Sequence, residues 1–252
     1  MTTSDAEPGP GQTVQVDRVA ARLATLLVLV DGRMPAGGHA HSGGVEAAVT
    51  DGSLVGLADL EKFLLGRLST AGVVATAFAA ATCHVLSGPH GAAPASSTPP
   101  AAPPVTIDGL DAELDARTPS PAQRAASRAQ GRTLLRAGRA AWPVPAGPRA
   151  PHHPVALGMV AVGAGLRPAD AALAAAHLTI TGPATAATRL LGLDPLAVTA
   201  VLARLADQVA ATARLGEAAA TLPPAALPAR TGLRLDLLAE RHQRADLRMF
   251  AS

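Results

Sequence analysis

The chain has 252 residues, which is enough for one large domain or two small ones. Its formal net charge is +2, Lys62 is its only lysine, and only 2% of its residues are aromatic. A nucleic-acid-binding surface, which combines a basic face with aromatic stacking residues, is therefore not expected. Cys83 is the single cysteine, which excludes an internal disulfide bond.

Alanine and leucine, both strong helix formers, dominate the composition, and few segments alternate as strands do. These features predict an all-α fold, a single globular domain of about nine or ten packed helices. Residues 1–16 are polar and aperiodic, so we expect them to be disordered and the helical domain to span residues 17–252. The N-terminus lacks the pattern of a secretion signal and the apolar windows fall short of a membrane span. We therefore expect a cytoplasmic protein without membrane contact.

In the first half of the chain, helical spacing of apolar residues begins at Asp17 and ends at Asp31-Gly32. After a glycine-rich loop, VEAAV predicts a short helix that stops before Gly52. Two more helices are expected over 58–68 and 71–86, and the second should be central because it is apolar on most sides. Residues 87–105 are rich in Pro, Ala and Ser and predict a flexible linker.

In the second half, prolines mark the predicted starts of helices, because proline suits the first helical position. The helices are expected to open at Pro121, Pro154, Pro168, Pro183 and Pro195. The last of these should continue to Leu215. A final amphipathic segment, 231–252, ends in Met249-Phe250, an apolar pair that serves either as a cap on the core or as a contact for a partner.

The loop RMPAGGHAHSGGVEAAV, residues 33–49, raises the possibility of a phosphate or nucleophile site. Its glycines match neither GxxxxGK[ST] nor GxGxxG, so a nucleotide cradle is not indicated. Ser42 lies in an A-x-S-x-G pattern similar to a nucleophile elbow, but no strand leads into it. We therefore interpret Ser42 as the N-cap of the next helix, and a serine hydrolase using Ser42 stays as an alternative.

The histidines permit a second alternative, a direct metal site. His39 and His41 are two residues apart, and His152 and His153 are adjacent. None of these spacings matches a closed structural site, so no metal ligand is assigned. A nickel-binding metallochaperone that uses His39 and His41 remains open.

Three segments together resemble the urease accessory protein F (UreF) family. RMPAGGHAHSGGVEAAVTDG, 33–52, is similar to the family's L-P-x-G-[aromatic]-x-x-S-x-G-L-E signature. HHPVALGMVAVGAGL, 152–166, and ATRLLGLDPLAV, 187–198, resemble its H-x-P-V-x-x-G and R-L-x-x-L-D-P segments. RHQRADLRMFAS, 241–252, is similar to its terminal H-x-x-x-x-x-R-L-F-x-S. The chain departs from these patterns at His39, which replaces an aromatic residue, and at Met249, which replaces leucine.

The resemblance implies an all-helical protein without enzymatic activity or a cofactor of its own. It further implies a homodimer that binds the accessory protein D (also called H) and the GTPase accessory protein G, and that helps to deliver nickel to apo-urease. The residues expected to contact partners are His39, Ser42, Glu46, His242, Arg248, Met249, Phe250 and Ser252. The residues expected to shape the loop are Pro35, Gly37, Gly43 and Gly44.

Overall fold

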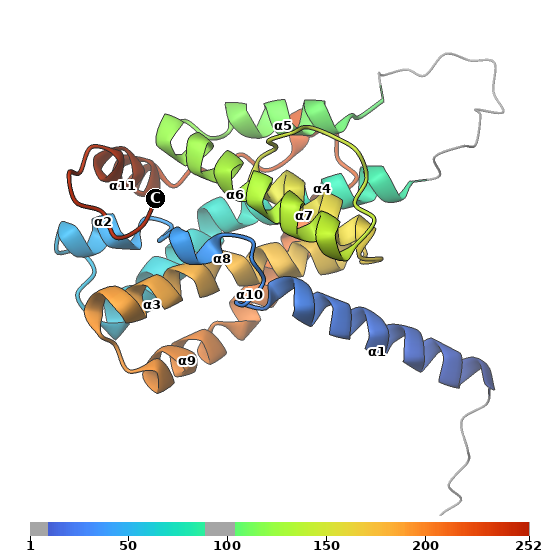
Figure 1. Cartoon of the computed structure of the whole chain (residues 1–252), viewed down its shortest axis with the longest axis horizontal. Helices are drawn as coiled ribbons and strands as arrows, with labels where there is room; N and C mark the ends of the chain where they lie inside the picture. The colour runs from blue at the N-terminus through green and yellow to red at the C-terminus, as the bar shows by residue number, and fades with distance from the viewer. Residues whose placement is uncertain (1–9, 89–103, 252) are drawn as a thin grey trace, which may run out of the picture.

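The computed structural model describes residues 10–88 and 104–251, and within them it contains helices and no β-strand (Figure 1). The prediction of an all-α fold is confirmed. The α-helices are α1 (Pro10–Val30), α2 (Val45–Thr50), α3 (Leu57–Arg67), α4 (Val73–Ser87), α5 (Ile107–Ala116), α6 (Pro121–Ala141), α7 (His153–Gly163), α8 (Pro168–Leu191), α9 (Pro195–Arg204), α10 (Ala206–Ala219) and α11 (Leu233–Gln243). Short helical turns are η1 (Gly38–Ala40), η2 (Leu68–Gly72) and η3 (Pro224–Ala226).

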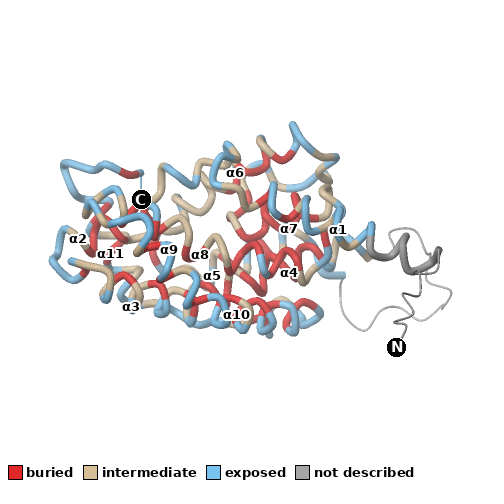
Figure 2. The backbone as a smooth tube through the Cα atoms, turned by 90° about the horizontal axis from the view of Figure 1, so that it is seen from below, coloured by how far each residue is buried: buried red, intermediate tan, exposed pale blue. Residues whose placement is uncertain are grey.

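Helix α4 lies at the centre of the molecule and packs against α7, α8 and α10 (Figures 1 and 2). Its alanine-rich surface permits this close approach on several sides, and Phe78 is completely buried within it. A second buried cluster, which includes Leu60, Leu64 and Ile180, joins α3 to α8. Helix α1 projects from the body of the molecule in Figure 1. The predicted central position of the helix over 71–86 is thus confirmed.

The apolar segment 57–87 is one continuous helix of 31 residues, because the π-helical turn η2 joins α3 to α4. By length and composition it is long enough to cross a membrane, although the sequence suggested that the apolar windows are too short for that. The protein buries 56% of its apolar window, as expected for the central helix of a bundle. Helices α9 and α10 pass the same test together but meet at an angle of 49°.

Proline 183 does not open a helix, so this prediction is wrong. Helix α8 continues through Pro183, whose missing N–H leaves the carbonyl of Thr179 without its helical donor. The Nε atom of Arg67 donates to this oxygen at 3.1 Å. A side chain from α3 thus replaces the hydrogen bond that proline removes, and the helix remains intact.

Several other helix boundaries differ from the sequence predictions. Helix α1 begins at Pro10, inside the segment 1–16, and residues 1–9 lie outside the described part. The long helix expected from Pro195 is divided at Leu205 into α9 and α10. Helix α5 was not predicted, although Thr106 caps it by accepting the N–H of Gly109. Most of the predicted linker 87–105 lies outside the described residues.

Glycines set the distance between α6 and α7. A Cβ atom added to Gly131 would lie 2.0 Å from the carbonyl oxygen of Pro151, and one added to Gly138 would lie 2.6 Å from a methyl carbon of Val160. Real Cβ atoms do not approach other atoms so closely. These two positions therefore need a residue without a side chain, which lets α6 approach the segment before α7 at Gly131 and the side chain of Val160 on α7 at Gly138.

Candidate functional site

The loop between α1 and α2 owes its shape to glycines in the left-handed region. The φ angles are +81° at Gly37, +61° at Gly43 and +93° at Gly44. A Cβ atom on Gly43 would also lie 3.1 Å from Cγ of Pro183, so this glycine allows close approach to α8. Alanine or a larger residue would be strained at any of these three positions. Pro35 lies in an exposed bend of the same loop.

Ser42 stabilises the start of α2. Its side chain is completely buried, and its Oγ accepts the N–H of Glu46 at 3.3 Å. The N-cap residue is Gly44, so the prediction that Ser42 is the N-cap is wrong: Ser42 lies two residues before the N-cap and accepts a backbone N–H of the first turn. A nucleophile has to reach its substrate, and a fully buried serine cannot. The geometry therefore does not support the serine hydrolase alternative.

Glu46 holds the C-terminal tail, residues 244–251. One carboxylate oxygen accepts the N–H of Met249 at 2.6 Å, and the other accepts the N–H of Phe250 at 2.9 Å. The N–H of Ala251 donates to the carbonyl of Ala40 at 2.7 Å. The tail is thus bound at its backbone to α2 and to the loop that precedes it. Charge-assisted hydrogen bonds of this kind are among the stronger ones in proteins.

The side chain of Phe250 adds an apolar anchor to these backbone contacts. It is only 5% exposed, and the guanidinium carbon of Arg189 lies 5.1 Å from the centre of its ring. The Nε2 atom of His242 lies 3.2 Å from the carbonyl oxygen of Phe250 and 3.7 Å from Glu46. Arg189 also reaches the carbonyl of His39. Loop, α2, α8, α11 and tail therefore meet at Phe250.

The outer side of the tail remains exposed. Leu247 is 92% exposed and Met249 is 61% exposed, while Arg248 reaches only the side chain of Gln243, at 3.5 Å. His39 is exposed on the neighbouring loop. We call Leu247, Arg248 and Met249 the tail patch.

The structure brings the described residues predicted to contact partners into one region. It also separates them into two groups. Ser42, Glu46, His242 and Phe250 are buried and hold the tail, whereas His39, Arg248 and Met249 face outward. Ser252 lies outside the described residues.

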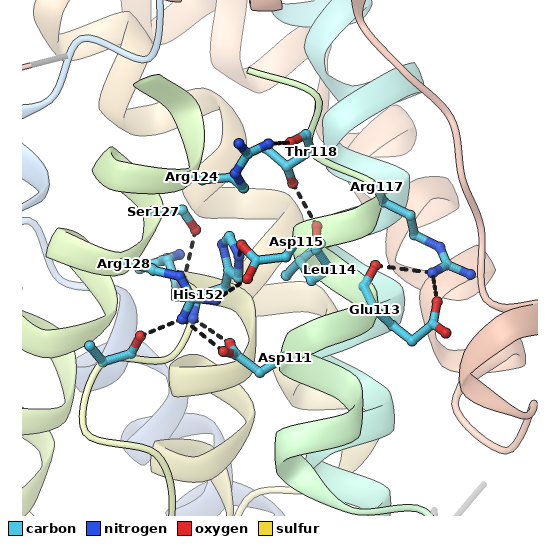
Figure 3. Close-up of polar contacts among 12 residues, drawn as sticks. Asp111, Glu113, Leu114, Asp115, Arg117, Thr118, Arg124, Ser127, Arg128 and His152 are labelled. Carbon is cyan, nitrogen blue, oxygen red and sulfur yellow. Dashed lines mark hydrogen bonds and ion pairs between the residues drawn. The ribbon is translucent and has the colours of Figure 1, made fainter. Parts of the chain in front are cut away.

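A second polar cluster, which sequence analysis missed, ties α5 to α6 and α7 (Figure 3). Arg128 bridges Asp111 at 2.8 Å and Asp115 at 2.5 Å, and Nε2 of His152 lies 2.8 Å from Asp115. The backbone N–H of His152 donates to Asp111 at 2.7 Å. This cluster fixes the segment that enters α7. Its only sequence signal was the pair of aspartates four residues apart in an unassigned segment.

The histidines do not assemble into a metal centre. Within the described residues, no group of three or more His, Cys, Asp or Glu side chains is placed to hold a metal ion. Burial lowers the pKa of His41, and the neighbouring His39 lowers it further. The nickel-binding alternative therefore gains no support from the geometry of the described residues. A buried histidine that is neutral in the folded protein makes stability depend on pH instead.

We expect the protein to become less stable between pH 6.5 and pH 4. Burial, together with nearby His41, lowers the pKa of His153 to about 4, so the unfolded chain binds this proton first as the pH falls. Stability present above pH 6.5 is lost across this window, by on the order of 3 kcal/mol for His153 alone. Urea unfolding at pH 7 and pH 4.5 measures the loss. His153→Gln should reduce the difference, whereas His84→Gln, at an exposed position, should not. Equal pH dependence in both variants would contradict the assignment.

Comparison with known proteins finds similarity to one family over most of the chain. The model of the UreF family matches residues 55–206. The chain is 46% identical to the urease accessory protein UreF of Mycobacterium sp. (strain JLS) over 236 residues, which cover 91% of this chain and 99% of that protein. The same figures hold for the protein of that name from Mycolicibacterium vanbaalenii. The protein from Mycobacterium tuberculosis (strain H37Rv) is 41% identical over 237 residues, with the same coverage.

Proposed function

The chain belongs to the UreF family, whose relatives are named urease accessory proteins, and from this membership we propose that it acts in urease maturation. The proposed role is that of a non-enzymatic cytoplasmic scaffold. It would assemble with the accessory protein D (or H), the GTPase G and apo-urease, and couple GTP hydrolysis to nickel insertion. Nickel is the cargo of this assembly, and no resident cofactor is proposed.

The observation that carries the proposal is the anchored tail. Glu46 binds the backbone at Met249 and Phe250, and the buried ring of Phe250 holds the chain end in place. The tail patch is therefore already ordered before a partner arrives. Binding to an ordered segment loses less conformational entropy than binding to a mobile one, which favours association.

Arg248 supplies the first test of this proposal. A guanidinium beside exposed Leu247 and Met249 is typical of residues that dominate interface energies. We expect Arg248→Ala to weaken co-purification with accessory protein D by at least about tenfold, which corresponds to about 1.4 kcal/mol. Urease activation in cells should fall with it. Arg214→Ala, at an exposed position on α10, is the matched control. Unchanged capture by the Arg248 variant would remove the tail patch from the interface.

We also expect the protein to form a homodimer, because the alanine-rich helices permit close contact between chains and dimers with two-fold symmetry are the commonest assemblies. Multi-angle light scattering across a range of concentrations measures the mass directly. A monomer at all concentrations, both alone and with accessory protein D, would rule out the dimer. That result would not affect the proposal that the tail patch binds accessory protein D.

A further inference from the structure

A cavity of about 250 Å³ lies between α4, α6, α8 and α11. Gly43, Gly44 and Arg67 contribute to its wall on the side of the loop, and Thr179 contributes from α8. A more open hollow beside α3 and α11 shares Arg67 and Leu235 with this cavity. Arg67 therefore lines both spaces, and the second one connects its side chain to the surface.

Arg67 carries a charge that no carboxylate neutralises. Its Nε donates to the carbonyl of Thr179 at 3.1 Å, and its Nη1 donates to the carbonyl of Gly43 at 2.5 Å. Both acceptors are uncharged, and no Asp or Glu of the described residues forms an ion pair with this guanidinium. Burial lowers the pKa of Arg67 to about 10, so the side chain remains a cation at neutral pH.

One edge of this guanidinium has no hydrogen-bond acceptor. The Nη2 atom lies 3.3 Å from the position that a Cβ of Gly43 would take, so it passes directly over this glycine, which also lines the cavity. None of the described residues accepts a hydrogen bond from Nη2. Supporting α8 at Pro183 needs only Nε. That structural role therefore explains neither the positive charge of Arg67 nor the presence of Nη2.

The other charged groups around the cavity do not supply the missing negative charge. Arg117 is already paired with Glu113, and Arg230 adds a further cation at the wall. Asp236 is the only carboxylate among the lining residues, and burial raises its pKa, as does its neighbour Glu240. The lining therefore has an excess of positive charge. Arg67 lines the cavity with no carboxylate of the described residues beside it, so the local positive potential favours binding of an anion.

We propose that this cavity is a binding site for a small carboxylate-like oxyanion, such as acetate, formate or bicarbonate, with Nη2 of Arg67 as its principal donor. Nη2 carries two N–H groups, and a hydrogen bond from a cation to an oxyanion is stronger than one between neutral groups. A volume of about 250 Å³ has room for such an ion together with several water molecules. The inference concerns the isolated chain and does not depend on the urease role.

The test is the thermal midpoint of the full chain in increasing sodium acetate or sodium bicarbonate, at constant ionic strength set with sodium chloride. We expect a saturable rise, with a dissociation constant of about 1 to 10 mM. Arg67→Gln keeps an amide N–H for Thr179 but removes the charge, and it should abolish the rise. Arg214→Gln, an exposed arginine outside the cavity lining, should respond like the unmodified chain.

A second variant covers the case in which Arg67→Gln fails to fold. Ala126 lines the cavity from α6, and Ala126→Leu reduces its volume without altering any charge. We expect this variant to bind acetate at least tenfold more weakly. The proposal is overturned if the unmodified chain responds to acetate and bicarbonate only as it does to chloride, or if both variants retain the full response. Either result leaves capture of accessory protein D unaffected, so failure here is distinct from failure of the proposed function.

Discussion

Gly131→Ala is expected to destabilise the protein by about 3 kcal/mol or more, as measured by urea unfolding. Helix propensity alone predicts the opposite, because alanine is favoured over glycine within a helix by about 1 kcal/mol. The steric clash outweighs this preference, so the substitution is expected to lower stability. The new Cβ would lie 2.0 Å from the carbonyl oxygen of Pro151, a backbone atom that no rotamer change can move.

The surrounding hydrogen bonds prevent the backbone near Pro151 from yielding. The N–H of His152 is bound to Asp111 at 2.7 Å, and the carbonyl of Ala150 accepts from Arg128 at 2.7 Å (Figure 3). A shift of this segment would therefore break the polar cluster that joins α5, α6 and α7. The lost contacts add to the cost of the clash itself.

Gly66→Ala is the matched control. Gly66 also lies inside a helix, but no atom lies within 4 Å of its added Cβ. Alanine should therefore stabilise the protein by about 0.5 to 1 kcal/mol through helix propensity. If both variants are equally stable, the close contact between Gly131 of α6 and the backbone of Pro151 does not exist in solution.

The helices were predictable wherever the signal is local. Proline at the first helical position identified the starts of α6, α7 and α9, and apolar spacing identified the central α4. The failure at Pro183 has a nonlocal cause. The donor from Arg67, on a different helix, satisfies the carbonyl that Pro183 leaves without its helical partner. No pattern within α8 itself contains this information.

The candidate site was predictable in its membership but not in its mechanism. A resemblance to family motifs brought Glu46, His242 and Phe250 together, although about two hundred residues separate the first from the other two. From sequence, the resemblance alone assigns Glu46 to a partner contact. In the structure its two carboxylate oxygens accept the backbone N–H groups of Met249 and Phe250. Every residue except proline carries a backbone N–H, so the residue types of the tail do not reveal this contact.

Phe250→Ala and Met249→Ala should differ strongly in their effect on stability, although the residues are neighbours. Phe250 is 5% exposed and Met249 is 61% exposed. Truncating the buried ring should cost about 3 kcal/mol, since it removes apolar burial and the contact with Arg189. Truncating Met249 should change stability by less than about 0.5 kcal/mol. Urea unfolding of both variants measures these costs, and co-purification with accessory protein D measures the effect on the partner.

The combination of the two measurements separates anchoring from contact. If the tail patch is the interface, Met249→Ala weakens capture while the protein remains as stable as before. Phe250→Ala then weakens both stability and capture, because release of the ring also frees the backbone that Glu46 holds. If Met249→Ala leaves capture intact, the tail only covers the core. The partner surface must then be sought on the exposed loop around His39. The tail contacts this loop as well, because the N–H of Ala251 donates to the carbonyl of Ala40.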